Sequence, residues 1–110
     1  MVIKIGDVIS DKDGRCFVIT YLNESYTIAT MCREIQDFLH WVTVDHKNKC
    51  EENINDKDHL KSIKKGRTLR HTSHNEEWLS MGYSDNGLII AKTIILKDGE
   101  LLKNYTKVNY

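Results

Sequence analysis

The stretch Cys16-Phe17-Val18-Ile19-Thr20-Tyr21 decides the fold class, because it is rich in β-branched and aromatic residues and has turn residues on both sides. Asp13-Gly14 precedes it and Asn23-Glu24 follows it. A D-G pair between two apolar runs is a strong hairpin signal. We therefore expect this strand to pair with Val8-Ile9-Ser10 on one side and with residues 25–31 on the other, as a three-stranded meander.

The same alternation continues in the third strand, where Tyr26, Ile28 and Thr30 share one face. Near the C-terminus, Leu88 to Leu96 is apolar on both faces, which predicts a central strand. Asn86-Gly87 predicts a turn before this strand.

The D-G pair Asp98-Gly99 predicts a second hairpin after the central strand. The chain is then expected to return through Glu100-Leu101-Leu102 and through a last segment from Tyr105 to Tyr110.

The segment 33–45 is compatible with a helix and with a strand. Ile35, Phe38, Leu39 and Val42 have the i, i+3, i+4, i+7 spacing of one helix face. The second half of the segment also has the β-branched and aromatic content of a strand. We favour a short helix followed by a strand.

Three further elements are predicted in the middle of the chain. Lys47 to Asp58 is polar and predicts a loop. Asp56 to Lys65 predicts a short helix that Gly66 ends at C′. Ser73-His74-Asn75-Glu76 matches the capping box S-x-x-E and predicts a helix of one or two turns through Trp78.

Together these elements predict an α+β fold. We expect a small antiparallel, partly closed β-sheet or barrel of SH3-like character, with two or three short helices inserted. The chain has 110 residues, which is typical of one globular domain, so residues 1–110 are expected to form a single domain.

The opening Ile5-Gly6-Asp7-Val8-Ile9, the turn at Gly14 and the strand Phe17-Val18-Ile19 resemble the start of an SH3-like small barrel. Similar openings occur in KOW-type modules and in MazF-type toxin endoribonucleases. The resemblance covers about the first 30 residues. It implies a small barrel and, through the toxins, ribonuclease activity.

Composition restricts the function classes. Hydrophobic residues make up 40% and charged residues 29%, which is an ordinary globular balance, and the formal net charge is zero. The chain therefore lacks the overall positive charge of a dedicated nucleic-acid binder. No apolar run reaches the roughly 20 residues that span a bilayer, so we expect no membrane partner.

The chain has three cysteines, which is an odd number, and neither a C-x-x-C pair nor a secretory signal is found in the sequence. We expect free thiols and a cytoplasmic protein. Cys16 and Cys32 fall in predicted strands among apolar neighbours, so a core role is expected for both. Cys50 lies in the predicted polar loop near His46 and Glu51. A nucleophilic cysteine needs a neighbouring base, so Cys50 is the cysteine best placed for that role.

His71 and His74 have the i, i+3 spacing that holds a metal on a helix, but the predicted helix begins between them. No carboxylate or cysteine at ligand spacing completes a set. We therefore assign no metal ligand, no catalytic residue and no cofactor.

The segment 61–71 has five basic residues and no acidic one. Such a run can neutralise phosphates or pair with an acidic protein surface, although a solvated surface has the same pattern. We take the following residues as the candidate partner-binding or nucleic-acid-binding site: Lys61, Lys64, Lys65, Arg67, Arg70 and His71.

Three functions follow from these observations. The first is a non-enzymatic binding or inhibitor protein that acts through a protein–protein surface, of the kind by which phages and mobile elements block host defence. The second is a nucleic-acid-binding module that uses the basic run. The third is a small toxin-like endoribonuclease with His71 or His74 as general base. The sequence leaves the partner and the oligomeric state open.

Overall fold

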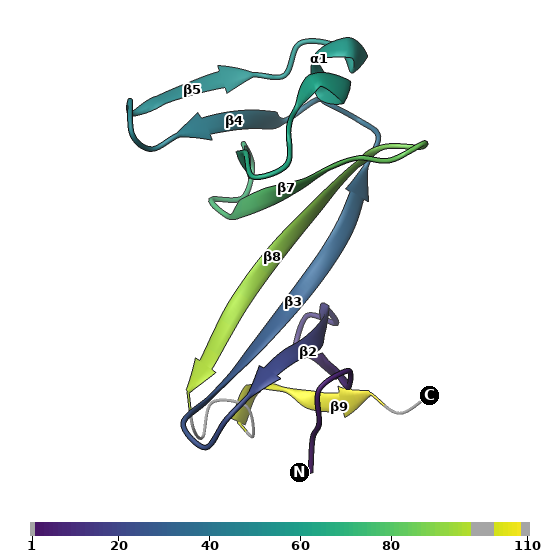
Figure 1. The fold of residues 1–110 in the computed structure, drawn as a ribbon, viewed down its shortest axis with the longest axis vertical. Coiled ribbons are helices and arrows are strands. Elements are labelled where there is room, and N and C mark those ends of the chain that lie inside the picture. The colour runs from purple at the N-terminus through teal and green to yellow at the C-terminus, as the bar shows by residue number, and fades with distance from the viewer. Residues whose placement is uncertain (1, 98–102, 109–110) are drawn as a thin grey trace. The chain divides into compact units, whose positions relative to one another are not determined.

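The computed structural model describes residues 2–97 and 103–108, and most of its ordered elements are β-strands (Figure 1). Strands make up 52% of the structure and helix 8%. The elements in chain order are β1 (Val8–Ser10), β2 (Cys16–Leu22), β3 (Tyr26–Ile35), β4 (Trp41–Asp45), β5 (Cys50–Asn53), α1 (Lys57–Ser62), β6 (Thr68–His71), β7 (Glu77–Tyr83), β8 (Leu88–Lys97) and β9 (Thr106–Val108).

The predicted α+β fold is wrong. Within residues 2–97 and 103–108 the chain has one complete helix, α1, where two or three were expected. The strands form an antiparallel sheet with the order β5-β4-β6-β7-β8-β3-β2-β1-β9. Because β5 and β9 are the ends of this order, the sheet is open, and the partly closed SH3-like barrel is wrong as well.

Contacts within the chain group it into two compact units. Unit 1 comprises residues 1–31 and 93–110, and unit 2 comprises residues 32–92. The division falls within β3 and within β8, so each of these long strands contributes residues to both units.

Unit 1 contains the predicted meander. β1 pairs with β2 around the turn at Gly14, which has a φ of 82° that glycine adopts without strain. β2 pairs with β3 around Asn23, whose Oδ1 accepts hydrogen bonds from the backbone N–H groups of Ser25 and Tyr26, both at 2.8 Å. Asparagine favours this type of turn because its side chain replaces a backbone acceptor.

The last described strand, β9, pairs with β1 on the side away from β2, and aligns Ile9 with Lys107. The predicted turn at Asp98-Gly99 and the segment Glu100-Leu101-Leu102 lie outside the described residues.

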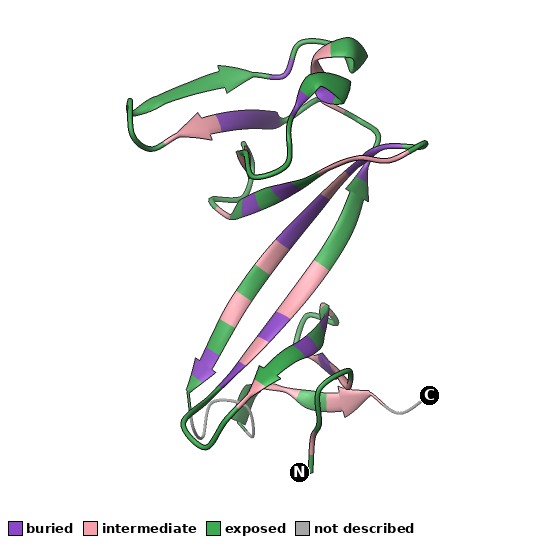
Figure 2. Cartoon of the chain, viewed as in Figure 1, coloured by how far each residue is buried: buried purple, intermediate pink, exposed green. Residues whose placement is uncertain are grey.

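The core of unit 1 lies on one face of its strands. The buried side chains come from β1, β2, β3 and β8, and alternate with exposed ones along the chain (Figure 2). They are Ile9, Phe17, Ile19, Ala29 and Leu96, with Ile3, Leu22, Met31, Ile94 and Tyr105 partly buried against them. Phe17 contacts Tyr105 edge to face, with ring centroids 6.2 Å apart.

In unit 2 the predicted helix through Ile35 and Val42 is absent from the described residues. Ile35 ends β3, and Val42 lies in β4. Between the two strands, Asp37 Oδ1 accepts a hydrogen bond from Leu39 N at 2.9 Å, and His40 has a φ of 70°. A short acidic side chain that bonds the following backbone favours a turn over a helix, so local chemistry outweighs the apolar spacing here.

The polar segment 47–58 is only partly a loop. Cys50–Asn53 forms the exposed strand β5, which pairs with β4 around a turn in which Asn48 N donates to Asp45 Oδ1 at 3.1 Å. An end strand with no buried side chain has no hydrophobic alternation, so the sequence pattern could not indicate it.

The short helix predicted from Asp56 is confirmed as α1, with Asp56 as N-cap: its Oδ1 accepts from His59 N at 2.7 Å. Leu60 is fully buried. The helix ends at Ser62, with Ile63 as its C-cap, and does not reach Gly66, whose N–H instead donates to Ser80 O at 2.8 Å.

The helix predicted from the capping box at Ser73 is also wrong. Trp78 and Ser80 are buried while Glu77 and Leu79 are exposed, which is the two-residue alternation of strand β7. The central strand from Leu88 is confirmed as β8, which lies between β7 and β3. The predicted turn at Asn86-Gly87 joins β7 to β8.

Gly87, just before β8, lies so close to the end of β3 that a side chain has no room there. A Cβ at Gly87 would lie 2.6 Å from Ile35 O and 3.0 Å from Glu34 Cγ. The backbone oxygen cannot move without disturbing β3. Gly87→Ala is therefore expected to reduce the free energy of unfolding by about 2 kcal/mol, as overpacking does. Chemical denaturation measures this change.

Asp85→Ala, an exposed substitution in the same turn, is the control and should change the free energy of unfolding by less than about 0.5 kcal/mol. Equal stability of Gly87→Ala and the wild type would contradict the close contact between the two strands.

Candidate functional site

The basic residues of segment 61–71 fall into two groups in unit 2, one on α1 and the connection after it and the other on β6. Lys61 lies on α1, and Lys64, Lys65 and Arg67 follow in the connection to β6; all four are exposed. Lys61 Nζ lies 6.0 Å from the centre of the Tyr83 ring. Lys64 and Arg67 line a pocket of about 240 Å³ that Glu52 and His59 also line, so charges of both signs meet there.

The other two residues of the run lie in β6 and point to opposite faces, because side chains alternate along a strand. Arg70 donates from Nε and Nη2 to the two carboxylate oxygens of Glu51, at 3.1 and 2.7 Å. This bidentate pair places a carboxylate directly against the guanidinium of Arg70. His71 shares its face with Leu69 and aligns with Trp41 of β4. The six predicted residues therefore do not form one continuous basic surface.

The predicted core role of Cys16 and Cys32 is wrong, because both side chains are exposed. Cys50 is exposed at the start of β5. All three cysteines are free. In the part of the chain that the structure describes, no group of three or more His, Cys, Asp or Glu side chains is arranged to hold a metal ion.

A larger feature of unit 1 is the sheet face opposite its core. The strand registers align Val8 with Val18 and Val108, Val18 with Thr30, and Tyr21 with Ile28. These alignments place all of these side chains on one side of the sheet. The hydroxyl oxygens of Thr30 and Thr93 lie 3.3 Å apart, which places the outward side chains of β8 on the same side.

We call this surface the outer face. Its members come from β1, β2, β3, β8 and β9 of unit 1, and all are apolar, aromatic, hydroxyl or thiol side chains. They are Val8, Ser10, Cys16, Val18, Tyr21, Tyr26, Ile28, Thr30, Thr93, Ile95, Thr106 and Val108. Along β8 the outward positions after Thr93 and Ile95 continue with Lys97, which ends the strand and is charged.

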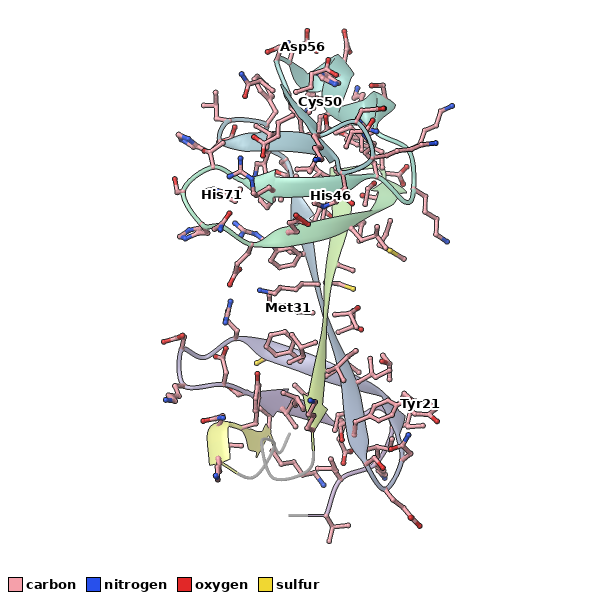
Figure 3. The ribbon with its side chains drawn as sticks, turned by 90° about the vertical axis from the view of Figure 1, so that its left-hand side faces the viewer. Tyr21, Met31, His46, Cys50, Asp56 and His71 are labelled. Carbon is pink, nitrogen blue, oxygen red and sulfur yellow. The ribbon has the colours of Figure 1, made fainter. Side chains whose placement is uncertain are left out.

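The apolar members of the outer face are accessible to solvent. Ile95 is 63% exposed, and Val18 and Tyr21 are each 44% exposed. The rings of Tyr21 and Tyr26 stack with centroids 5.7 Å apart. Figure 3 labels Tyr21 among the side chains of unit 1. Tyr26, Ile28 and Thr30 share one face, as their alternation predicted, and this face lies opposite the core.

Unit 2 contains a cluster of three histidines, of which the spacing in the sequence indicated only His71 and His74. The ring of His71 lies 4.8 Å from that of His74 and 5.9 Å from that of His40, measured between centroids. Trp41 contacts His71 edge to face at 5.0 Å. Figure 3 labels His71 in this unit. The turn before β4 brings His40 to the cluster, and no sequence spacing indicated that contact.

His71 and His40 also line a pocket of about 330 Å³, together with Arg33. Burial lowers the pKa of His71 below its usual value, and the charges of His74, His40 and Arg33 lower it further. Each of these causes disfavours the imidazolium form, so the neutral ring is favoured at neutral pH.

No protein family, curated protein or solved structure matches the chain. The resemblance of its opening to KOW-type modules and MazF-type toxins therefore stays a prediction.

None of the helices in the described residues is long and apolar enough to cross a membrane.

The lowered pKa of His71 has a consequence for stability. The unfolded chain has the ordinary histidine value of about 6.5 and binds a proton more readily than the folded chain does. Stability from this residue is present above that pH and is lost as the pH falls below it. His71→Asn should therefore flatten the decrease in the free energy of unfolding between about pH 7 and pH 5, as measured by urea denaturation.

His46→Asn is the control, because His46 lies outside the cluster and contacts Glu77 at 2.8 Å. His46→Asn should leave the decrease in the free energy of unfolding between about pH 7 and pH 5 as steep as in the wild type. An unchanged slope in His71→Asn would show that the cluster does not disfavour the charged ring. Loss of stability from the lowered pKa values of Asp7, Asp11 and Asp45 falls in a separate, more acidic window.

Proposed function

We propose that the chain is a non-enzymatic binding protein that recognises a partner protein through the outer face of unit 1. The observation that supports the proposal is the extended, uncharged and exposed surface on one side of the sheet. In a chain with 29% charged residues, a sheet face of five strands without a charge before Lys97 is unusual. Contiguous exposed apolar surface is characteristic of interaction sites, whereas single exposed apolar residues are common everywhere.

The composition of the outer face supports a protein as the occupant. The centres of protein interfaces are depleted in charge and enriched in aromatic residues. Tyr21 and Tyr26 form a preordered aromatic pair, and tyrosine is among the residues that dominate binding energy at interfaces. Two rings that are already stacked lose little side-chain freedom on binding, which lowers the cost of association.

A nucleic acid is a poor partner for this surface, because phosphate recognition requires cations and the outer face offers none before Lys97. The nucleic-acid-binding prediction depends instead on the exposed part of the basic run in unit 2, which is Lys61, Lys64, Lys65 and Arg67. Arg70 already forms an ion pair with Glu51, so the basic run has fewer cations available for phosphates than the sequence indicated.

The proposal includes an inhibitory role and a reducing compartment. A small binding protein without a catalytic site acts by occupying a working surface of its partner, so we expect the partner's activity to fall when the complex forms. Three exposed, free cysteines are compatible with the cytoplasm, where thiols are kept reduced.

Two substitutions on the outer face test the proposal. Ile95→Lys and Tyr21→Ser should each weaken binding of the partner at least about 30-fold, as loss of an interface hot spot does. The assay is affinity capture from host lysate with nuclease treatment, followed by titration of the captured partner. Because Ile95 is 63% exposed, the substitution should leave the thermal unfolding curve unchanged.

Leu79→Lys is the matched control, because Leu79 is an exposed strand residue in unit 2, with 46% of its surface accessible. It should retain the partner at wild-type affinity. A partner held equally well by all three variants would overturn the outer face as the binding surface. Loss of all captured material after nuclease treatment would favour the nucleic-acid-binding prediction instead.

A further inference from the structure

The connection between β6 and β7, residues 72–76, contains a hydrogen bond that depends on the protonation state of His71. Ser73 N donates to His71 Nδ1 at 3.1 Å. A ring nitrogen that accepts such a bond carries no proton, so the bond exists only while the ring is neutral with its proton on Nε2. Protonation gives Nδ1 a hydrogen of its own, and the bond from Ser73 N is then lost.

The connection lies at the surface of unit 2. None of residues 72–76 is buried, and none belongs to a strand or helix. Thr72 N donates to His40 O at 2.7 Å, which joins the connection to the turn before β4. A segment that buries no side chain opens locally at a small cost in free energy. The loss of a single hydrogen bond is therefore enough to change how often this segment is open.

The titratable and charged groups around His71 come from each segment packed against it. Its ring lies 4.8 Å from that of His74 in the connection and 5.9 Å from that of His40 in the turn before β4, measured between centroids. The charged residues of the surrounding segments are Arg33 and Glu34 near the end of β3, Asp37 in the turn, and Glu76 at the end of the connection.

The carboxylates of these segments bond to groups other than His71. Glu34 Oε1 accepts a hydrogen bond from Gln36 Nε2 at 3.2 Å, and Asp37 Oδ1 accepts one from Leu39 N at 2.9 Å. Glu76 forms an ion pair with Lys92 at 3.0 Å. In the described part of the chain, neither Glu34 nor Asp37 forms an ion pair with a histidine.

The surroundings of His71 therefore disfavour its charged form while the connection is closed. Burial, and then the charges of His74, His40 and Arg33, lower the pKa of the ring. Opening of the connection separates the ring from His74 and from Ser73 N. The open form therefore binds a proton more readily than the closed form, so closure is most stable above the ordinary histidine value of about 6.5 and weakens as the pH falls below it.

We propose that His71 is a pH-sensitive switch, whose protonation opens the connection 72–76 while the strands of unit 2 stay paired. Opening breaks the bonds of Ser73 N to the ring and of Thr72 N to His40 O, so the turn before β4 is released as well. Trp41, which contacts His71 edge to face, then becomes accessible. All of these residues belong to unit 2, so the switch is independent of the outer face in unit 1.

The test is hydrogen exchange of the backbone amides of the intact chain, measured by NMR at about pH 7.5 and about pH 5, on either side of the ordinary histidine pKa. Each rate is compared with the intrinsic rate at the same pH. The protection of Thr72 N and Ser73 N should fall about fivefold at the lower pH, which corresponds to one hydrogen bond of ordinary strength. Ser80 N, which donates to Arg67 O at 2.8 Å, should keep its protection.

His71→Asn separates protonation from the loss of the ring. The side-chain oxygen of asparagine accepts a hydrogen bond from a backbone N–H two residues on, and it does not titrate. Ser73 N should therefore be as protected at about pH 5 as at about pH 7.5 in this variant. His46→Asn is the matched control and should lose protection at Ser73 N as the wild type does.

Three results would overturn the switch. The first is equal protection of Ser73 N at the two pH values in the wild type. The second is the same loss of protection in His71→Asn as in the wild type. The third is a parallel loss at Ser80 N, which would show that acid weakens the strands of unit 2 as a whole instead of opening the connection.

Discussion

The alternation of side chains along the strands of unit 1 is the constraint on which the rest of the structure depends. Each strand presents successive residues to opposite faces, and only one of these faces has a core. Phe17 and Ile19 of β2 are buried, and Val18 between them is exposed. Burial of one face therefore exposes the other, and the exposed one consists of apolar, aromatic and hydroxyl side chains instead of charges.

Unit 2 meets the same constraint in a different way. α1 places the fully buried Leu60 in the core, and the strands contribute Trp41, Leu69 and Trp78. At the surface of this unit, Arg70 forms an ion pair with Glu51.

Local signals in the sequence predicted the parts of the fold that depend on neighbouring residues. The turns at Gly14, Asn23 and Asn86-Gly87 formed as expected, and Asp56 begins α1. The failures have physical causes. The capping-box match at Ser73 carried no information about Trp78 and Ser80, which the sheet buries. The exposed strand β5 has no apolar residue at alternate positions that would reveal it.

The candidate sites were predictable only in part, for the same reason. Alternation placed Tyr26, Ile28 and Thr30 on one face, but only strand pairing shows that Val18, Tyr21 and Ile95 extend it. The spacing of His71 and His74 was visible, whereas their contact with His40 and the shared pocket with Arg33 depend on the turn before β4.

The most direct test of the outer face as a binding surface uses the native cysteines. Cys16 lies on the outer face of unit 1, and Cys50 lies in β5 of unit 2; both are exposed and free. Thiol alkylation rates are measured by mass spectrometry for the free chain and for the affinity-purified complex. If the outer face binds the partner, the complex will show slower alkylation of Cys16 and an unchanged rate at Cys50. Slowed alkylation of Cys50 with an unchanged rate at Cys16 would contradict it.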